Sequence, residues 1–396
     1  MDAKNRCRAS EKQYLYAPGP TDVPPYVLRA LGSPITHHRS PAFSEVMVEV
    51  WQDLQYLYKT QQEVYMILSS ATGAMEASVS NLLSPGDEAI VIRGGKFGER
   101  WGELCEAYGV TPHCLDVEWG DVITPEQLED ALKQFPKAKA VYSTSSETSS
   151  GCEFDIEGYA KVVGKTNAVL VCDATSAIGA TPLHMDEWGV DVLVSAGHKA
   201  LMLPPGLAFI ALSDKAWKLT ESSTCPKFYL DLKAYKKNFE KQTTPYTPGV
   251  NLIVGLRESL KAFRNEGYNS VMKRHEILGH AARTGVKALG LELFSKRPFN
   301  GLTAIKVPDG IDGGAVGKKF RVDYGMTIAG GQSHLKGKIF RISHMGYSDK
   351  MDVPFALSVT EMVLKELGHP IELGKGVAAA QQVILDQWSG LDLIEG

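Results

Sequence analysis

Residues 190–206 read Val-Asp-Val-Leu-Val-Ser-Ala-Gly-His-Lys-Ala-Leu-Met-Leu-Pro-Pro-Gly. The apolar, β-branched first part is typical of a strand that is buried on both faces of a parallel sheet. Lys199 follows this strand directly, and the Pro-Pro-Gly that comes next cannot continue a helix. We therefore expect Lys199 at the edge of a parallel sheet, at the point where a strand ends.

A second buried run ends in a carboxylate. Residues 168–173 read Ala-Val-Leu-Val-Cys-Asp, so Asp173 should lie at the same edge as Lys199, where ligands of open α/β sheets bind. An amine and an acid so placed suit pyridoxal phosphate (PLP). The lysine can hold its aldehyde as a Schiff base, and the acid can pair with its pyridinium nitrogen. The alternative is a solvated lysine and an aspartate that caps the next helix.

The whole chain has the composition of an ordinary globular enzyme. Its 396 residues, of which 44% are hydrophobic and 22% charged, exceed one ordinary domain, so we expect two domains. A net charge of -4 gives no reason to expect nucleic acid or an anionic membrane as a partner. The start lacks the apolar stretch of a signal peptide, and no later run is long enough to span a bilayer, which predicts a cytoplasmic protein. The six cysteines have no metal-ligand spacing, so we expect reduced thiols and no metal site.

Three segments differ in pattern. The polar and Pro-rich start predicts an extended N-terminal arm over residues 1–25. From 26 to 265, strands alternate with helices, which predicts a large α/β domain with a mostly parallel sheet flanked by helices. This domain should bind the cofactor. Over 266–396 a long helical stretch precedes short strands and another helix, which predicts a smaller C-terminal α+β domain.

Three further strand ends offer candidate cofactor contacts. Residues 70–76 lead through small residues into a helix expected from Ala74. The unpaired amides there suit a phosphate, unless Thr72 merely caps the helix. Phe97, on the Gly-rich loop that precedes a helix expected from Arg100, could stack on a flat ring or simply pack. Residues 145–151 form a row of hydroxyls, one of which could bond the ring oxygen of pyridoxal, or a hydroxyl-rich turn.

These segments together resemble the class V aminotransferases of fold type I, in the branch of alanine–glyoxylate and serine–glyoxylate (serine–pyruvate) aminotransferases. The resemblance runs from about Pro18 to Leu367, and it is most specific at residues 173–183, 199–206 and 256–260, followed by 329–332 and 338–342. It implies the fold of a PLP-dependent transferase. It also implies transfer of an amino group from a small amino acid, alanine or serine, to a small 2-oxo acid, glyoxylate or pyruvate.

The resemblance also implies roles for matching residues. Lys199 would bind the cofactor covalently and move a proton between the substrate α-carbon and the cofactor C4′, while Asp173 would keep the pyridine nitrogen protonated. Phe97 would be the stacking aromatic, and Thr148 the hydroxyl near the ring oxygen O3′. The remaining contacts in the same chain would come from Thr72, Gly73, Ala74, Thr175 and His198.

Two further residues complete the site implied by the resemblance. Thr247 would reach the phosphate of the neighbouring subunit, so the active site would be shared in a homodimer. Arg341 would bind the substrate α-carboxylate, a bidentate task that suits a guanidinium better than an ammonium. The chain departs from many relatives at His198, where they have glutamine, and a histidine charge depends on pH. It departs from some at Thr244, where a tyrosine crosses the dimer; Tyr246 is the alternative here.

Two other reactions of PLP stay open. A lyase or cysteine desulfurase on the same fold needs a nucleophilic thiol near the substrate. No cysteine follows Cys225, and we expect Cys152 to be a packed thiol. An aspartate-type aminotransferase needs a second cation for the distal carboxylate, for which Arg39 and Arg100 are candidates.

A non-enzymatic role is the third alternative. Some members of the branch carry the label soluble hydrogenase small subunit, which suggests a non-catalytic subunit of a redox complex. The presence of Lys199, Asp173 and Arg341 disfavours that role, as does the lack of a cysteine cluster for an iron–sulfur centre.

Overall fold

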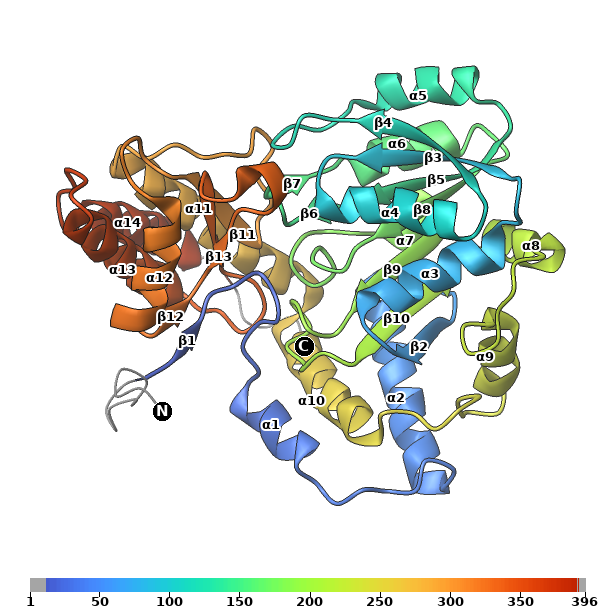
Figure 1. Ribbon diagram of the computed structural model, residues 1–396. Helices are drawn as coiled ribbons and strands as arrows, with labels where there is room; N and C mark the ends of the chain where they lie inside the picture. The colour runs from blue at the N-terminus through green and yellow to red at the C-terminus, as the bar shows by residue number, and fades with distance from the viewer. Residues whose placement is uncertain (1–11, 390, 392–396) are drawn as a thin grey trace, which may run out of the picture.

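A seven-stranded sheet forms the centre of the larger part of the molecule (Figure 1). The computed structural model describes residues 12–389 and 391. In sheet order the strands are β2 (Val64–Leu68), β10 (Leu207–Leu212), β9 (Val192–Ala196), β8 (Val169–Asp173), β5 (Ala138–Thr144), β3 (Glu88–Arg93) and β4 (Thr111–Asp116). Strand β10 is antiparallel to β2 and β9, and the other neighbouring pairs are parallel. The prediction of a mostly parallel sheet is confirmed.

The strands at the centre of this sheet are buried on both faces, as their continuous apolar runs predict. Every residue of β8 and β9 is buried. Successive side chains point to opposite faces, so Leu170 enters one hydrophobic core and Val171 the other. The sheet therefore lies between two apolar layers, and its strand ends are held rigidly.

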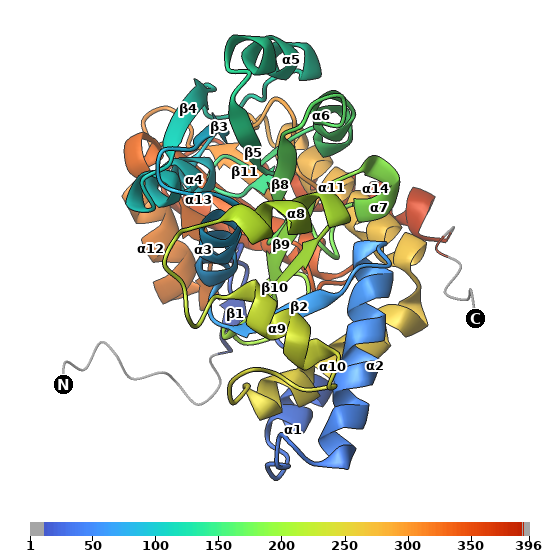
Figure 2. The ribbon, with the colours of Figure 1, turned by 90° about the vertical axis from the view of Figure 1, so that its right-hand side faces the viewer.

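Helices cover both faces of the sheet. The core on one face includes residues of α3 (Ala71–Leu82), α4 (Lys96–Ala107), α8 (Asp214–Ser222) and α9 (Leu232–Phe239). The core on the other includes residues of α1 (Pro25–Leu31), α2 (Pro41–Tyr58), α5 (Pro125–Gln134), α6 (Ile156–Val163), α7 (Met185–Trp188) and α10 (Val250–Glu266). Figure 2 shows α3 and α4 on one side of the strands and α6 and α7 on the other.

The C-terminal part of the chain builds a second, smaller α+β region around its own core. Its antiparallel sheet has the order β11 (Leu302–Lys306), β14 (Ile339–Ser343) and β13 (Ala329–Gly330). Its helices are α11 (Tyr268–Ala288), α12 (Gly313–Asp323), α13 (Asp352–Glu366) and α14 (Lys375–Trp388), with a 3₁₀ turn η2 (Ser333–Leu335). The α+β character agrees with the sequence pattern, while the boundary between residues 265 and 266 stays a prediction. Within residues 12–389 no helix is both long and apolar enough to cross a membrane.

The N-terminal arm connects the two regions. Strand β1 (Tyr14–Leu15) pairs in parallel with β12 (Met326–Thr327) of the smaller region. The chain then runs without a helix to Pro24, and α1 begins at Pro25, a residue well suited to the first turn of a helix. Along this path Thr21 donates a hydrogen bond of 2.7 Å from its hydroxyl to the carbonyl oxygen of Lys199. The arm therefore lies against the loop that carries the lysine; residues 1–11 of the predicted arm lie outside the described residues.

Candidate active site

A cavity of about 210 Å³ lies at the carboxyl ends of the parallel strands. Its walls come from six places in the sequence: the arm, the start of α3, the first turns of α4, the turn after β5, the loop after β8 and the loop after β9. Of the predicted site residues, seven line this cavity: Thr72, Phe97, Thr148, Asp173, Thr175, His198 and Lys199. The remaining four, Gly73, Ala74, Thr247 and Arg341, do not line it.

Lys199 is buried where β9 has ended, with an exposed fraction of 8%. Burial lowers the pKa of its amine to about 8; the nearby Arg341 lowers it as well, while Asp173 and Glu147 act in the opposite direction. The amine donates a hydrogen bond to the carbonyl oxygen of Pro18 in the arm. An amine with a lowered pKa and one backbone partner is a ready nucleophile for a carbonyl group.

Asp173 is the last residue of β8 and is 3% exposed. One carboxylate oxygen accepts a hydrogen bond of 2.8 Å from the backbone N–H of Thr175. Burial raises the pKa of Asp173, and Thr175, Arg100 and Lys199 oppose that shift. A buried carboxylate at the end of a cavity is placed to pair with a cationic ring nitrogen.

The start of α3 is open toward the cavity. Ser70 is its N-cap residue and makes no side-chain cap; the N–H of Gly73 donates to the Ser70 carbonyl oxygen (2.9 Å), which leaves the other amides of the first turn for a ligand. Thr72 does not cap the helix: its hydroxyl accepts a hydrogen bond of 3.1 Å from Nη1 of Arg100. Gly73 and Ala74 follow in the first turn, so only their backbone could reach an anion. The helix was expected to begin at Ala74 and begins at Ala71 instead, because small residues tolerate a helical start without a side-chain cap.

Four buried polar atoms that belong to residues of the cavity wall have no hydrogen-bond partner among the described residues: Thr144 Oγ1, Ser146 Oγ, Thr175 Oγ1 and His198 Nδ1. Buried polar groups without partners are costly, so groups gathered around one cavity indicate a polar ligand. They lie beside Asp173, Lys199 and the uncapped start of α3. This set suits a flat, polar molecule that carries both an anionic group and a ring nitrogen.

The charge of His198 was expected to depend on pH, and its surroundings place the change well below neutral pH. Burial and the adjacent Lys199 lower the pKa of its imidazole to about 4. The ring is therefore neutral at physiological pH, and it can offer a hydrogen bond to an anion but not a positive charge.

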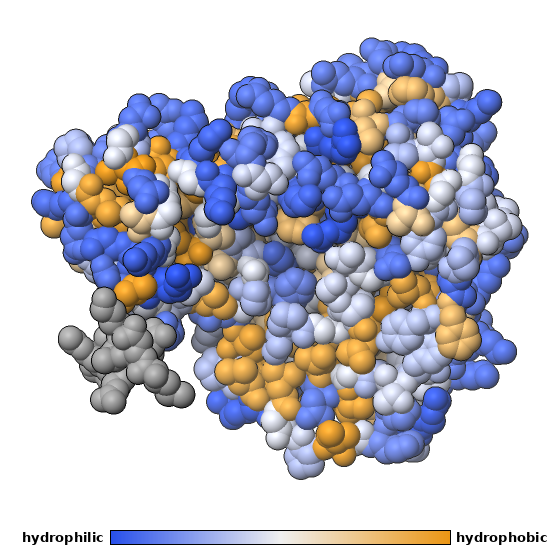
Figure 3. All heavy atoms as spheres, viewed as in Figure 1, coloured by the Kyte–Doolittle hydropathy of each residue, from blue (hydrophilic) through white to orange (hydrophobic). Residues whose placement is uncertain are grey.

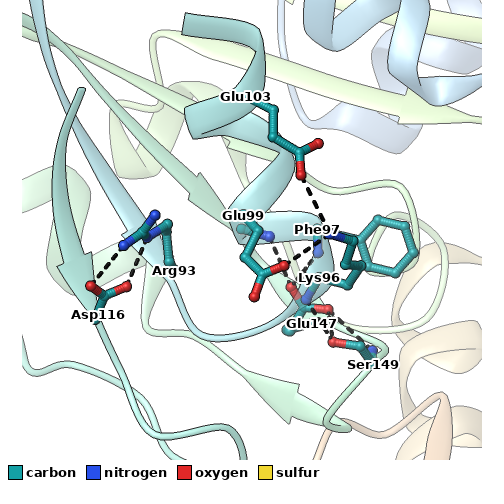
Figure 4. A network of polar contacts seen from close by, with 9 residues as sticks. Arg93, Lys96, Phe97, Glu99, Glu103, Asp116, Glu147 and Ser149 are labelled. Carbon is teal, nitrogen blue, oxygen red and sulfur yellow. Dashed lines mark hydrogen bonds and ion pairs between the residues drawn. The ribbon is translucent and has the colours of Figure 1, made fainter. Parts of the chain in front are cut away.

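Phe97 lies in the first turn of α4, which begins at Lys96, and not on a loop before a helix that starts at Arg100. The reason is Glu147, which no local pattern in the sequence indicates. Its buried carboxylate accepts hydrogen bonds of 3.0 Å from the backbone N–H groups of Phe97 and Gly98, and so caps the helix from another part of the chain (Figure 4). The same carboxylate accepts a bond of 2.5 Å from the hydroxyl of Ser149. Gly95 is required here because a Cβ would collide with Glu147.

Arg341 lies on β14 of the smaller region and is 5% exposed. Its guanidinium donates to the carbonyl oxygen of Gly330 through Nε (3.1 Å) and Nη2 (2.6 Å), and to that of Thr148 through Nη1 (2.5 Å). Thr148 belongs to the turn after β5 that lines the cavity. Burial lowers the pKa of Arg341 to about 10, and Glu147 opposes this shift. The arginine therefore holds the two regions together directly behind the cavity wall.

Two residues beyond the predicted set, Gly19 and Arg100, also shape the cavity. Gly19 of the arm passes so close to Lys199 that a Cβ would meet its side chain, and its φ of 137° favours glycine. Arg100, considered only as a candidate for a distal carboxylate, lines the cavity beside Thr72, whereas Arg39 is exposed on the segment between α1 and α2. Neither contact could be predicted from the local sequence pattern, because each joins segments that are far apart in the sequence.

Thr247 is exposed on the segment between α9 and α10 and lies outside the cavity of its own chain. Neither alternative beside it enters the cavity: the Thr244 hydroxyl donates to the carbonyl oxygen of Tyr246 (2.7 Å), and the Tyr246 hydroxyl to that of Phe228 (3.0 Å). These two contacts hold the segment in a fixed shape that presents Thr247 outward.

None of the five cysteines in the described part of the chain lines the cavity. Cys152 is fully buried, lies 3.0 Å from the hydroxyl of Ser295 (Sγ to Oγ) and does not line the cavity. Burial raises the pKa of its thiol, which keeps it protonated. The prediction of a packed thiol agrees with this position, and a desulfurase nucleophile is not found at Cys152.

The chain is similar to known proteins over nearly its whole length. Residues 13–354 match the family described as aminotransferase class-V. A protein of Synechococcus sp. (strain PCC 6716) named soluble hydrogenase, small subunit, is 42% identical, over 94% of this chain and 99% of that protein. The serine–glyoxylate aminotransferase of Hyphomicrobium methylovorum is 35% identical, over 93% of this chain and 94% of that protein. The crystal structure of ureidoglycine–glyoxylate aminotransferase from Bacillus subtilis, 30% identical, has a TM-score of 0.91 and covers 96% of this chain and 100% of that one.

Proposed function

This chain belongs to the class V aminotransferases, and we propose that it moves the amino group of alanine or serine to glyoxylate or pyruvate with PLP as cofactor. The observation that carries the proposal is one cavity lined by the amine of Lys199, the carboxylate of Asp173 and the start of α3. Both the class V membership and the fold type I architecture were predicted from sequence and are confirmed.

The cavity fits PLP in its chemistry. When bound, the cofactor supplies an aldehyde that holds the amino group and a ring that withdraws electrons from the substrate α-carbon. Asp173 would face the ring nitrogen, Phe97 the ring face, and Thr148 the ring oxygen. Thr72, the first-turn amides of Gly73 and Ala74, and His198 would face the phosphate. The unpartnered hydroxyl of Thr175 lies two residues from Asp173, on the same wall.

Lys199 would have two tasks. With a pKa of about 8, a substantial fraction of its amines is neutral near physiological pH, which is the form that attacks an aldehyde. The same nitrogen, once free, would take a proton from the substrate α-carbon and deliver it to the cofactor C4′. The arm would keep this nitrogen in place through Pro18 and limit the access of water.

Arg341 would bind the α-carboxylate of the substrate. Its guanidinium already lies at the boundary between the cavity wall and the smaller region, where it donates to two backbone carbonyl oxygens. A carboxylate can replace these neutral acceptors because its charge makes the hydrogen bonds stronger. Alanine, serine, glyoxylate and pyruvate each carry one carboxylate, so one such cation is enough for them.

A shared site in a homodimer is part of the proposal. The segment that carries Thr247 lies beside exposed aromatic residues, Phe228 with 79% and Tyr229 with 39% of its surface exposed. Leu28 on α1 is 53% exposed as well, and Figure 3 shows apolar residues gathered over α1 and α10. A second copy of the chain would cover such surfaces and receive Thr247 at its cofactor phosphate. The five cysteines among residues 12–389 are free thiols, which fits the cytoplasm, our expected compartment.

The test is a panel of amino donors assayed with glyoxylate and with pyruvate. We expect alanine and serine to be used faster than aspartate, and a visible absorption band from bound PLP that is absent in Lys199→Ala. A purified protein that binds PLP but transfers no amino group from any donor would contradict the proposed reaction. A clear preference for aspartate would instead favour the aspartate-type alternative.

A further inference from the structure

The phosphate of PLP needs a positive charge inside this cavity. A phosphate monoester carries about −1.5 to −2 charges at pH 7. The start of a helix supplies only about half a positive charge, and Asp173 adds a negative one on the same wall. A buried anion without a compensating cation is strongly unfavourable, so the protein must provide one. This reasoning rests on the proposed PLP chemistry.

Two nearby bases do not provide that cation. Lys199 would be committed to the aldehyde of the cofactor, so its amine would not be available as a cation for the phosphate. His198 is neutral at physiological pH because burial and Lys199 lower its pKa to about 4. In the cofactor-free cavity His198 therefore carries no charge, and the unpartnered Nδ1 of its ring can take part in one hydrogen bond.

Arg100 is the remaining cation. Of the lysines and arginines in the described part of the chain, Arg100 and Lys199 alone line the cavity. Arg100 lies one helical turn after Phe97, and its guanidinium carbon is 5.1 Å from the centre of that ring. Its Nη1 donates to the hydroxyl of Thr72, 3.1 Å away, which fixes the guanidinium at the second residue of α3.

We infer that Arg100 binds the cofactor phosphate and holds it against Thr72 and the first turn of α3. A guanidinium has five N–H donors in a planar fork, and the bond to Thr72 uses one of them. The others can meet phosphate oxygens in the geometry that arginine favours. In this assignment Phe97 and Arg100, on one face of α4, hold the ring and the phosphate of the same molecule. The assignment also means that Arg100 is not free to select a dicarboxylic donor.

The experiment compares PLP with pyridoxal, which has the same aldehyde and ring but no phosphate. The full-length protein, stripped of cofactor, is titrated with each compound, and dissociation constants are taken from visible absorbance and tryptophan fluorescence. The variants are Arg100→Gln and, as a matched control, Arg93→Gln. Glutamine at 100 keeps an N–H donor for Thr72 but no charge. Arg93 pairs with Asp116 through two bonds of 2.7 Å and does not line the cavity (Figure 4).

We expect Arg100→Gln to bind PLP about 10- to 100-fold more weakly while its affinity for pyridoxal changes by less than about 2-fold, since only a charge-assisted contact to phosphate is lost. Arg93→Gln should leave both affinities unchanged. Equal losses for PLP and pyridoxal would show that Arg100 only shapes the cavity, and an unchanged PLP affinity would show that the phosphate lies elsewhere; either result overturns the inference.

A second variant protects the test against misfolding. If Arg100→Gln does not fold, Arg100→Lys keeps the charge without the fork, and we expect a PLP loss between wild type and about 10-fold with pyridoxal unaffected. A PLP loss matched by pyridoxal would again overturn the inference. Wild-type protein that binds neither compound would instead overturn the proposed function on which the inference rests.

Discussion

The strand ends of the large sheet place buried charged side chains in the wall of the cavity, and strand β14 of the smaller region places Arg341 directly behind that wall, but the hydrogen-bond partners of the two sets differ. On the sheet side, four polar atoms of the cavity wall have no partner among the described residues, and Lys199 has one backbone acceptor. On the β14 side, all three nitrogens of the Arg341 guanidinium donate to backbone carbonyl oxygens. The cavity at the sheet is thus prepared for a ligand, whereas under the proposed function Arg341 would have to exchange its carbonyl partners for a substrate carboxylate.

The difference follows from the elements that carry each half. Asp173 ends β8 and Lys199 follows β9, and both strands are buried between two hydrophobic cores, so the positions of the two residues do not depend on the ligand. Arg341 contacts Thr148 across the boundary between two regions with separate cores, so a ligand that competes for its donors can change how the regions meet. We expect substitutions on the sheet side to abolish chemistry, and those on the β14 side to weaken substrate recognition.

The largest effect is expected from Lys199→Ala. Loss of the proton-transferring amine should reduce turnover by at least about 10²–10⁴-fold, and covalent attachment of PLP should be lost entirely. Borohydride reduction of the wild-type protein with bound PLP, followed by peptide mapping, should place the label on Lys199. A label on another lysine would falsify the assignment of the whole sheet side.

Asp173→Asn should have the next largest effect. Asparagine keeps the size of the side chain and can still accept from the Thr175 N–H, but it removes the charge that would keep a ring nitrogen protonated. Removal of one preorganised electrostatic contact typically costs about 10²–10³-fold in kcat. PLP should still attach to Lys199, so the variant should keep a visible band while it loses turnover. Near wild-type kcat would mean that Asp173 does not face the ring.

Arg341→Leu tests the β14 side. It should bind PLP with a normal spectrum and lose about 10- to 100-fold in kcat/KM for every amino donor, because a charged hydrogen bond contributes about 1.5–3 kcal/mol. Arg341→Lys serves as the matched control that keeps the charge without the fork, and it should lie between wild type and the leucine variant. If the leucine variant keeps wild-type rates with alanine and serine, the carboxylate site is elsewhere.

The sequence could predict the parts of this site that follow from local pattern. Continuous apolar runs that end in a polar residue identified the ends of β8 and β9, and therefore Asp173 and Lys199. The same reasoning could not show that β10 runs antiparallel, because an apolar run buried on both faces reads alike in either direction.

Glu147 shows what local pattern cannot reveal. In the sequence it is one acid in a row of hydroxyls, and its function as the cap of α4 depends on a segment about 50 residues earlier. Position 19 is similar. It requires glycine because a Cβ there would collide with the side chain of Lys199, which lies 180 residues later. Contacts of this kind arise from tertiary packing, so they follow only from the folded structure.

The smallest effect, and the one that compares the two halves most directly, concerns the pH at which the cofactor-free protein captures PLP. Burial and Arg341 lower the pKa of Lys199 to about 8, and Asp173 and Glu147 oppose that shift. Only the neutral amine attacks an aldehyde, so the rate of capture should rise about tenfold from pH 7 to pH 9 and level off above. Stopped-flow absorbance measures this rate. A lysine with its ordinary pKa would give a rate that still rises at pH 10, which would contradict the buried environment of Lys199.

Substitutions of Asp173 and of Arg341 should shift the midpoint of this pH dependence, the pH of half-maximal capture rate, in opposite directions. Asp173→Asn removes a negative charge that favours the protonated amine, so its midpoint should lie at lower pH than that of wild type. Arg341→Leu removes a positive charge that disfavours the protonated amine, so its midpoint should lie at higher pH. Arg93→Gln, which removes a half-buried arginine outside the cavity, should leave the midpoint unchanged. Shifts in the same direction for the first two variants would mean that Lys199 responds to a general change in packing and not to the separate charges of the sheet and β14 sides.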